Sequence, residues 1–348
     1  MSNSIPTPES EKIEVLAKNI GRDDIFIQDI VSYSKNLERR GLPILFSLKH
    51  FCLISNLNYE NIIKIHQNRD QLYLNKFLKK KRYGFRHIRI PSENLRIIHK
   101  WIKEHILGKV EMPSYVTAYC KNRSIIDNAT LHLNSQLLIK MDLSDFYDHI
   151  DTKIVYKIFR RLGYGKSVSI YMSEFCCVFD GKLGKFVLPQ GASTSPILSN
   201  MACKNMDLRL NAYAKQNGFR YSRYSDDITF SSTEKLKISY KEIIKIIAES
   251  GFRVNTKKTR FLTKKNRQTV TGLNINNGLS ISKRYRKNIS THVHNCVRFG
   301  VKHHLEKLGL QRVNYREWLL GNIFYIASVH PNQGKSLKQK FDLINWVY

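Results

Sequence analysis

The sequence has few acidic residues. Its 28 Asp and Glu stand against 58 Lys and Arg, which gives a formal charge of +30 at pH 7 and a pI near 9.9. A chain this basic favours a polyanionic partner, and nucleic acid is the main one. An anionic membrane surface is the competing interpretation. However, the sequence has no unbroken apolar run of about 18 residues and no signal peptide at its N-terminus. We therefore expect no membrane partner.

Cysteine is also sparse, and its spacing is uninformative. The six cysteines never form a C-x-x-C pair; they are Cys52, Cys120, Cys176, Cys177, Cys203 and Cys296. This pattern supports neither a zinc site nor a disulfide framework. Reduced thiols are typical of the cytoplasm, which is the expected location.

Length and hydrophobic content are those of an ordinary globular protein. The 348 residues, 42% of them hydrophobic, are enough for a substantial core and about two or three subdomains. Apolar periodicity predicts helices near residues 13–16, 62–65, 152–180, 196–215 and 240–250, with Ser195 as N-cap and Pro196 at the first helical position of the fourth. Strands are predicted over 85–90 and 137–142.

The most informative stretch is Phe219 to Ser232, FRYSRYSDDITFSS. β-favouring residues flank a short polar centre, which predicts a hairpin with Asp226 and Asp227 at its turn. Two adjacent carboxylates repel, so a cation is expected between them or beside them. A solvated turn is the alternative interpretation.

A third carboxylate ends the apolar run Leu137 to Asp142. An unpaired charge is costly at the end of a buried strand. Asp142 could instead be the N-cap of a helix that begins near Asp151. Together with Asp226 and Asp227, it forms a set of oxygen ligands suited to two Mg²⁺ ions. Asp145 and Asp148 are less certain members of the same site.

Five short motifs occur in one order along the chain. They are N-A-x-x-H (Asn128, His132), D-x-x-D-F-Y from Asp142, L-P-Q-G at Gln190, Y-S-D-D, and V-T-G (Val270, Thr271, Gly272). Y-S-D-D resembles the active-site hairpin of reverse transcriptases, and the full set resembles the retron family of bacterial reverse transcriptases. Asn128 and His132 serve as family markers, because each could equally be a buried hydrogen-bonding residue.

This resemblance covers residues 75 to 280 and implies an α+β fold, a right-hand polymerase. The expected domains are a helical N-terminal region (1–75), fingers and palm with an antiparallel sheet (76–280), and a basic helical thumb that binds RNA (281–348). The thumb histidines are expected to be neutral rather than metal ligands. Asp148-His149-Ile150 departs from the Pro-Ser-Ile often found in the family, which puts the substrate side after Tyr147 in question.

The resemblance also implies roles for four residues around the nucleotide. Tyr147 would pack under the deoxyribose and exclude a 2′-hydroxyl, although it could be a core tyrosine. Gln190 would contact template and dNTP. Arg86 and Lys258 would contact phosphates, with Arg89 as a second candidate on the same strand as Arg86. Lys258 could also be a plain surface lysine, as could the run Lys79 to Lys81.

The function implied by the family is RNA-directed DNA synthesis. Part of a cognate structured non-coding RNA would be copied into single-stranded DNA, primed from a guanosine 2′-hydroxyl of that RNA, to give branched msDNA. The expected partners are this RNA, the RNA–DNA hybrid, dNTPs and an effector protein in anti-phage defence. The alternatives are a reverse transcriptase of the group II intron type, which the absence of a maturase or endonuclease extension disfavours, a metal-dependent nuclease, and a non-catalytic RNA-binding protein.

Overall fold

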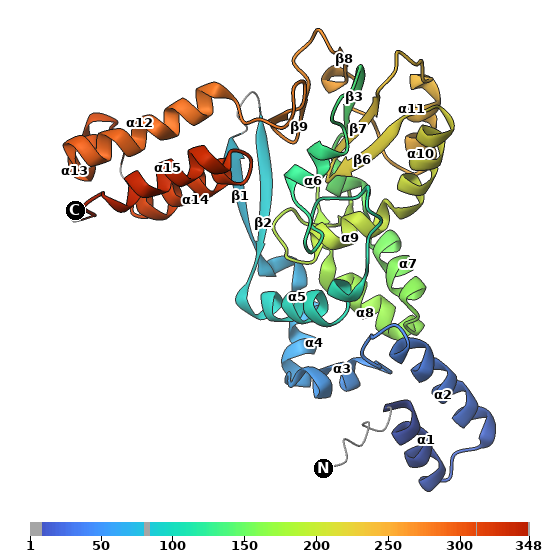
Figure 1. Cartoon of the computed structure of the whole chain (residues 1–348). Helices are drawn as coiled ribbons and strands as arrows, with labels where there is room; N and C mark the ends of the chain where they lie inside the picture. The colour runs from blue at the N-terminus through green and yellow to red at the C-terminus, as the bar shows by residue number, and fades with distance from the viewer. Residues whose placement is uncertain (1–8, 80–83, 311, 347–348) are drawn as a thin grey trace, which may run out of the picture. The chain divides into compact units, whose positions relative to one another are not determined.

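The computed structural model describes residues 9–79, 84–310 and 312–346, which mix helices with four small antiparallel sheets (Figure 1). These residues belong to two compact units. Unit 1 comprises residues 1–120, 143–209 and 241–254, and unit 2 comprises residues 121–142, 210–240 and 255–348. Each unit is therefore assembled from segments distant in sequence. The predicted domains 1–75, 76–280 and 281–348 remain a prediction.

Four helices open unit 1, and the first and fourth lie where the N-terminal periodicity predicted helices. They are α1 (Glu9–Asn19), α2 (Asp24–Glu38), α3 (Leu48–Ser55) and α4 (Tyr59–Gln67). Polar N-caps fix where three of them begin: Asp23, Ser47 and Asn58 each accept a hydrogen bond from a main-chain N–H in the first turn. Buried Ala17, Ile27 and Val31 hold α1 against α2.

A two-stranded ribbon follows in unit 1, after a 3₁₀ turn at Arg69–Leu72. Strand β1 (Tyr73–Lys79) pairs with β2 (Phe85–Pro91) along its whole length. Gly84 immediately precedes the return strand and has a φ of 82°, a conformation that glycine adopts without strain. Helix α5 (Glu93–His105) and a 3₁₀ turn at Leu107–Lys109 come next. Lys80 and Lys81 of the predicted lysine run lie outside the described residues.

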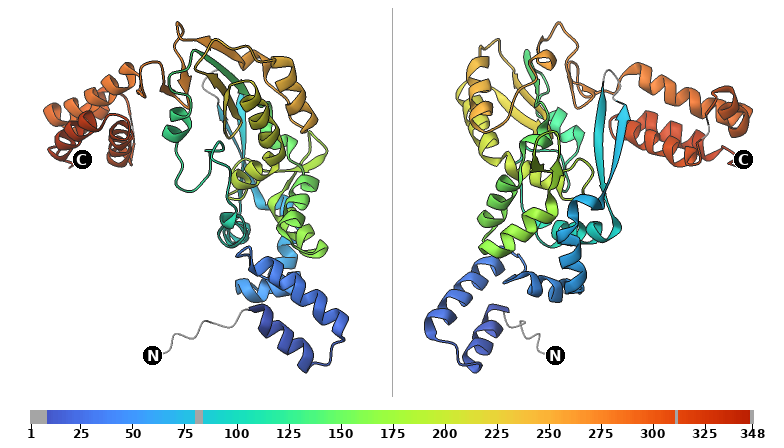
Figure 2. Two further views of the ribbon diagram at one scale, coloured as in Figure 1. Left: turned by 45° about the vertical axis from the view of Figure 1, so that its right-hand side comes forward. Right: turned by 180° about the vertical axis from the view of Figure 1, so that it is seen from behind.

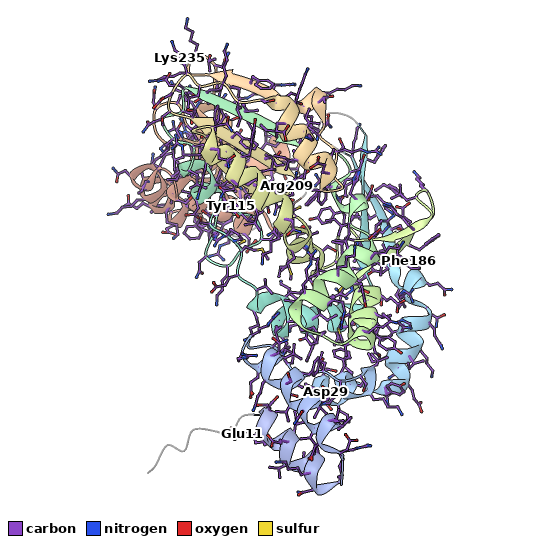
Figure 3. The ribbon with its side chains drawn as sticks, turned by 90° about the vertical axis from the view of Figure 1, so that its right-hand side faces the viewer. Glu11, Asp29, Tyr115, Phe186, Arg209 and Lys235 are labelled. Carbon is purple, nitrogen blue, oxygen red and sulfur yellow. The ribbon has the colours of Figure 1, made fainter. Side chains whose placement is uncertain are left out.

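The second segment of unit 1 was predicted to be helical over 152–180 with a stop at Gly163 and Gly165, and the stop is confirmed because one helix ends at Gly163 and the next begins after Gly165. The segment contains η3 (Phe146–His149), α7 (Thr152–Leu162), α8 (Lys166–Cys176) and a hairpin of β4 (Val178–Asp180) with β5 (Lys185–Val187). The prediction was wrong from Val178 onward, because β-favouring residues precede a glycine-containing turn there. Phe186 of β5, labelled in Figure 3, packs under the Arg69 guanidinium, whose central carbon is 4.9 Å from the ring centroid.

The helix predicted over 196–215 is two helices, α9 (Ser195–Ala202) and α10 (Lys204–Gln216). The break falls at Cys203, which is buried, and no Pro or Gly marks it in the sequence. Helix α9 begins at Ser195, and Thr194 occupies the N-cap position, so the predicted cap was one residue late. Helix α11 (Tyr240–Glu249) matches its prediction and ends before Gly251.

The main sheet lies in unit 2, with strands in the order β6-β7-β3-β8. These strands are β3 (Leu137–Asp142), β6 (Arg220–Tyr224), β7 (Asp227–Ser232) and β8 (Arg260–Thr263), and η4 (Thr256–Lys258) precedes the last. The predicted strand over 137–142 is confirmed. It is one of the two inner strands, and three of its six residues are buried.

Unit 2 continues with a tight hairpin and four helices. The hairpin joins β9 (Thr269–Val270) to β10 (Leu273–Asn274). Helices α12 (Lys283–Phe299), α13 (Val301–Lys307), α14 (Tyr315–Ala327) and α15 (Pro331–Asp342) form one group in both views of Figure 2. One hydrophobic core joins these helices to α6 (Ile125–Thr130) and the sheet, through Ala129, Leu138 and Val270. Within the described ranges no helix has the length and apolarity needed to span a membrane.

Candidate active site

The Asp-Asp pair lies at the tip of the β6–β7 hairpin in unit 2. The strands pair from Arg220 with Ser231 to Tyr224 with Asp227, which leaves Ser225 and Asp226 as the turn. Ser225 has a φ of 61°, and two-residue hairpin turns require a positive φ at their first position. The hairpin predicted over 219–232 is therefore confirmed, although its strained position is filled by serine.

The third carboxylate is the cross-strand neighbour of this pair. Asp142, the last residue of β3, is in register with Asp227 of β7. Directly opposed residues point to one face of a sheet, with Cβ atoms about 5 Å apart. The N-cap alternative for Asp142 is excluded, because Asp151 caps α7 by accepting a hydrogen bond from the Ile154 N–H at 2.9 Å. Three carboxylates thus gather at one end of the sheet.

This crowding shifts the protonation of the hairpin carboxyls. Loss of surrounding water raises the pKa of Asp227 to about 6, and repulsion from Asp226 and Asp142 adds to the effect. The pKa of Asp226 is raised chiefly by burial and further by Asp142. Such shifts are typical of sites that bind cations or catalyse reactions.

Lys258 supplies a cation to this cluster. Its Nζ lies 2.8 and 2.9 Å from the two carboxylate oxygens of Asp142. The main chain brings the two residues together, because the Asn255 N–H donates to the Asp142 carbonyl at 2.7 Å just before η4. The Lys258 side chain is 62% exposed, so it can move away from the carboxylate without breaking a packed contact.

The carboxylate set suits divalent cations. No three His, Cys, Asp or Glu side chains in the described ranges are already arranged around a common metal position. In this structure the Lys258 ammonium stands where a cation would meet Asp142. Asp142, Asp226 and Asp227 offer only hard oxygen donors, which is the chemistry that Mg²⁺ prefers. The donor set therefore fits the metal expected for the reverse transcriptase family.

Sequence reasoning missed one residue of this hairpin. Arg223 of β6 is fully buried, and its Nη1 donates to the Ser225 carbonyl at 2.9 Å. A guanidinium therefore holds the main chain of the turn that carries Asp226. An arginine inside a predicted strand was the only signal in the sequence. The alternation of side chains along the hairpin did not reveal which face of the sheet would be buried, and therefore did not show that Arg223 would be.

The predicted nucleotide residues Tyr147, Gln190 and Arg86 all belong to unit 1, whereas the carboxylates and Lys258 belong to unit 2. Tyr147 lies in η3 and is half-buried, with its hydroxyl 3.4 Å from that of Tyr119. Burial raises the pKa of the nearby Asp148, and the negative charge of Asp145 adds to it. Arg86 is exposed on β2.

The loop that carries Gln190 is built against β2. The Gln190 carbonyl accepts a hydrogen bond from the Arg89 N–H at 2.7 Å. Gly191 has a φ of 130°, and a Cβ atom there would lie 2.5 Å from the Arg89 carbonyl oxygen. The Arg89 side chain is buried in an ion pair with Asp180. Gly191 is thus required by its close approach to the main chain of β2. The Arg89 guanidinium is already paired with the Asp180 carboxylate.

The two family markers lie at α6 and the β9–β10 hairpin. Asn128 and His132 are buried, as their alternative interpretation allowed. Thr271 and Gly272 form the turn between β9 and β10, with φ values of 46° and 87°. The pair of positive φ angles explains the glycine, because residues with a side chain are strained in this region.

Comparison with known proteins gives consistent matches. A family model described as "Reverse transcriptase (RNA-dependent DNA polymerase)" matches residues 78–275. Retron Ec86 reverse transcriptase of Escherichia coli is 30% identical over 263 residues, which cover 74% of this chain and 80% of the relative. Retron Mx65 reverse transcriptase of Myxococcus xanthus is 25% identical over 333 residues, or 90% of this chain and 75% of the relative.

Solved structures resemble the chain more distantly. Apo telomerase from Candida tropicalis superposes with a TM-score of 0.44 at 14% identity, covering 79% of this chain and 58% of the telomerase chain. A likeness at this level adds nothing to the assignment, which rests on the sequence matches. The sequence matches identify the fold as α+β, the right-hand polymerase with fingers, palm and thumb. The chain belongs to the retron reverse transcriptases and is therefore an RNA-directed DNA polymerase.

Proposed function

We propose that this reverse transcriptase copies part of a cognate structured non-coding RNA into single-stranded DNA, and that it primes synthesis from a guanosine 2′-hydroxyl of that RNA. The product would be branched msDNA, used with an effector protein in anti-phage defence. The observation that carries the polymerase chemistry is the pairing of Asp142 with Asp227 beside Asp226. The similarity of the chain to retron reverse transcriptases supports the proposed self-priming step.

Asp142, Asp226 and Asp227 are the proposed catalytic and metal-binding residues. Two Mg²⁺ ions, when bound, would supply the charge that activates the attacking hydroxyl and stabilises the leaving pyrophosphate. The protein's own part is to hold three oxygen donors at the ends of two paired strands. The raised pKa values of Asp226 and Asp227 indicate that the site favours added positive charge.

Lys258 is proposed to have two positions. Without substrate its ammonium neutralises Asp142, and with substrate it would contact the triphosphate of the dNTP. Its exposed stem gives it the freedom to do both. Tyr147 would pack under the deoxyribose, Gln190 would contact template and base, and Arg86 would contact phosphate. Arg86 is exposed and able to bind an anion, whereas Arg89 is paired with Asp180.

The first turns of α12 are the proposed contact for the RNA. Arg284, Lys287, Asn288 and Thr291 line one shallow depression, and their spacing puts them on a single helix face. Cationic and amide side chains in this pattern suit the phosphates and 2′-hydroxyls of an RNA stem. The net positive charge of the chain adds long-range attraction.

The test begins with nucleic acid that co-purifies with the protein expressed from its native genomic neighbourhood. The extract is treated with RNase, DNase and a debranching enzyme, in parallel with an Asp226→Ala, Asp227→Ala double variant. We expect a short DNA joined to RNA through a 2′,5′ linkage, present in the wild type and lost in the variant. Sequencing its two strands identifies template and branch point.

Other outcomes separate the alternatives. If RNA co-purifies without DNA, yet the wild type extends an ordinary DNA primer with dNTPs, self-priming is refuted and a reverse transcriptase of another type remains. If the wild type degrades nucleic acid without dNTPs and incorporates none, the chain acts as a nuclease.

A further inference from the structure

His132 joins the catalytic hairpin to the element before it. The residue lies two positions after α6, and its side chain is fully buried. Both ring nitrogens are used: Nδ1 is 2.7 Å from the Ser231 hydroxyl, and Nε2 is 2.7 Å from the Ser222 hydroxyl. One imidazole therefore bridges β6 and β7, the two strands of the hairpin whose turn holds Asp226 and whose second strand begins at Asp227.

The bridged serines lie on the same face of the sheet as Asp142 and Asp227. Because Ser231 pairs with Arg220 and Ser222 pairs with Thr229, the two serines are diagonal neighbours on adjacent strands. Side chains alternate between faces, so Ser231 shares a face with Thr229 and Asp227. His132 thus holds the hairpin from the side on which the carboxylates act.

The bridge depends on a neutral imidazole. Burial and the positive charge of Arg220 lower the pKa of His132 to about 3. A neutral ring has one N–H donor and one acceptor nitrogen, so one serine accepts a hydrogen bond and the other donates one. Both bonds are consequently satisfied at any pH at which a polymerase works.

The main chain around His132 is tied to the same two strands. Arg220 Nη2 donates to the Leu133 carbonyl at 2.9 Å, and the Gln136 N–H donates to the Ser232 carbonyl at 2.8 Å. On the far side of α6, Thr271 Oγ1 donates to the Ile125 carbonyl at 2.8 Å. The V-T-G turn therefore contacts the first residue of α6, and His132 follows the last turn of this helix.

We propose that His132 is a positioning residue for the catalytic hairpin, which it fixes to α6 and the V-T-G turn. The bridge gives the hairpin an anchor outside its own ladder, so the turn that carries Asp226 keeps its position although Asp142, Asp226 and Asp227 repel one another. Loss of the bridge is expected to loosen residues 220–232, weaken metal binding and lower kcat. The inference rests on the proposed catalytic role of Asp226 and Asp227.

The test compares a single variant with a triple variant. His132→Phe keeps an aromatic ring but leaves two buried hydroxyls without their partner, which destabilises the fold. His132→Phe with Ser222→Ala and Ser231→Ala removes those hydroxyls as well, and we expect it to recover thermal stability. A His99→Phe variant is the matched control, because His99 is a buried histidine of unit 1 bonded to the Phe175 carbonyl at 2.7 Å.

Three readouts are measured on each protein. They are hydrogen exchange of the peptide 220–232, Mn²⁺ binding by electron paramagnetic resonance, and kcat with KM for dNTP on an RNA template. In both the single and the triple variant we expect faster exchange, several-fold weaker Mn²⁺ binding, and kcat lowered about tenfold by misplacement of the carboxylates. His99→Phe should lose stability without changing these three readouts.

A triple variant with wild-type stability, exchange, Mn²⁺ binding and kcat would refute the positioning role and leave His132 as a stabilising residue alone. The variant Asp227→Asn separates this failure from that of the active-site assignment. If Asp227→Asn keeps polymerase activity, the carboxylate site itself is wrong. If it is inactive while the triple variant is normal, only the inference on His132 fails.

Discussion

At the scale of single residues, the proposed metal ligand Asp227 has a cost to stability at neutral pH. Its pKa of about 6 in the folded protein lies above the ordinary value of 3.8. Between these values the folded state holds a proton that the unfolded state has lost. The stabilising contribution of this group is therefore present below pH 4, decreases as the pH rises to 6, and is absent above it.

The variant Asp227→Asn should consequently stabilise the metal-free protein at pH 7.5 and abolish polymerisation. The expected gain is on the order of 1 kcal/mol, less than the full pKa shift implies, because the side chain remains exposed and solvent screens the repulsion. Thermal unfolding in EDTA at pH 7.5 and pH 4 measures it. A gain that is equal at both pH values would contradict the assignment of the raised pKa.

Lys258 forms an ion pair with Asp142, so a cation that binds this carboxylate would have to displace its ammonium. We expect Lys258→Met to bind Mn²⁺ more tightly than the wild type by a few-fold, while its KM for dNTP rises about tenfold because a phosphate contact is lost. Lys258→Arg, which keeps the charge, is the control. The two-position account is wrong if Lys258→Met binds Mn²⁺ no better than the wild type.

His132 should also shape the stability of the protein in acid. Its pKa of about 3 lies below the ordinary 6.5, so its stabilising contribution is complete above pH 6.5 and is lost as the pH falls toward 3. From pH 6.5 to 5 this amounts to about 2 kcal/mol. Urea unfolding of wild type and His132→Phe should give curves that converge at low pH. Parallel curves would mean that His132 titrates normally.

At the scale of structural elements, alternation and turn chemistry predicted much of the fold. The hairpin over 219–232, the strand ending at Asp142 and helix α11 were all expected from sequence. The break at Cys203 was not, because the buried position of this residue decided it rather than local propensity. Strand β4 was missed although β-favouring residues precede a glycine-containing turn there. The partners of His132 lie about 90 and 99 residues further along the chain, on β6 and β7, so no local pattern could reveal them.

The loop after β5 offers a test at this scale. A Cβ atom at Gly191 would collide with the Arg89 carbonyl, and its positive φ adds strain. We expect Gly191→Ala to destabilise the protein by about 2–4 kcal/mol. The matched control is Gly181→Ala in the β4–β5 turn, where a Cβ atom meets nothing within 4 Å. Equal stability of the two variants in urea unfolding would show that the loop at Gln190 is not held against β2.

At the scale of the whole molecule, positive charge is the dominant property. A chain with 58 Lys and Arg should bind RNA with a steep dependence on salt. If the face of α12 meets phosphates, Arg284→Ala with Lys287→Ala should reduce the slope of log K against log salt by about 2. Lys12→Ala with Lys241→Ala, two exposed lysines elsewhere, is the control. Equal slopes for both double variants would exclude α12 as the RNA contact.

Family and fold were therefore accessible from a handful of motifs, whereas the arrangement that supports the carboxylates was not. The order of the motifs predicted the polymerase, and the register of β3 with β7 brings Asp142 to Asp227, as the resemblance and the metal chemistry of the three carboxylates led us to expect. Support by His132 and the V-T-G turn depends on contacts between distant segments of unit 2 that no linear spacing encodes.

The most direct test is single-nucleotide incorporation on an RNA template by the variants Asp142→Asn, Asp226→Asn and Asp227→Asn. The matched control is Asp29→Asn, an exposed aspartate of α2 labelled in Figure 3. Each of the three variants should lose about a thousandfold or more in rate while staying folded, and the control should lose nothing. Retention of near wild-type rate by any of the three would contradict the assignment of these carboxylates as the catalytic centre.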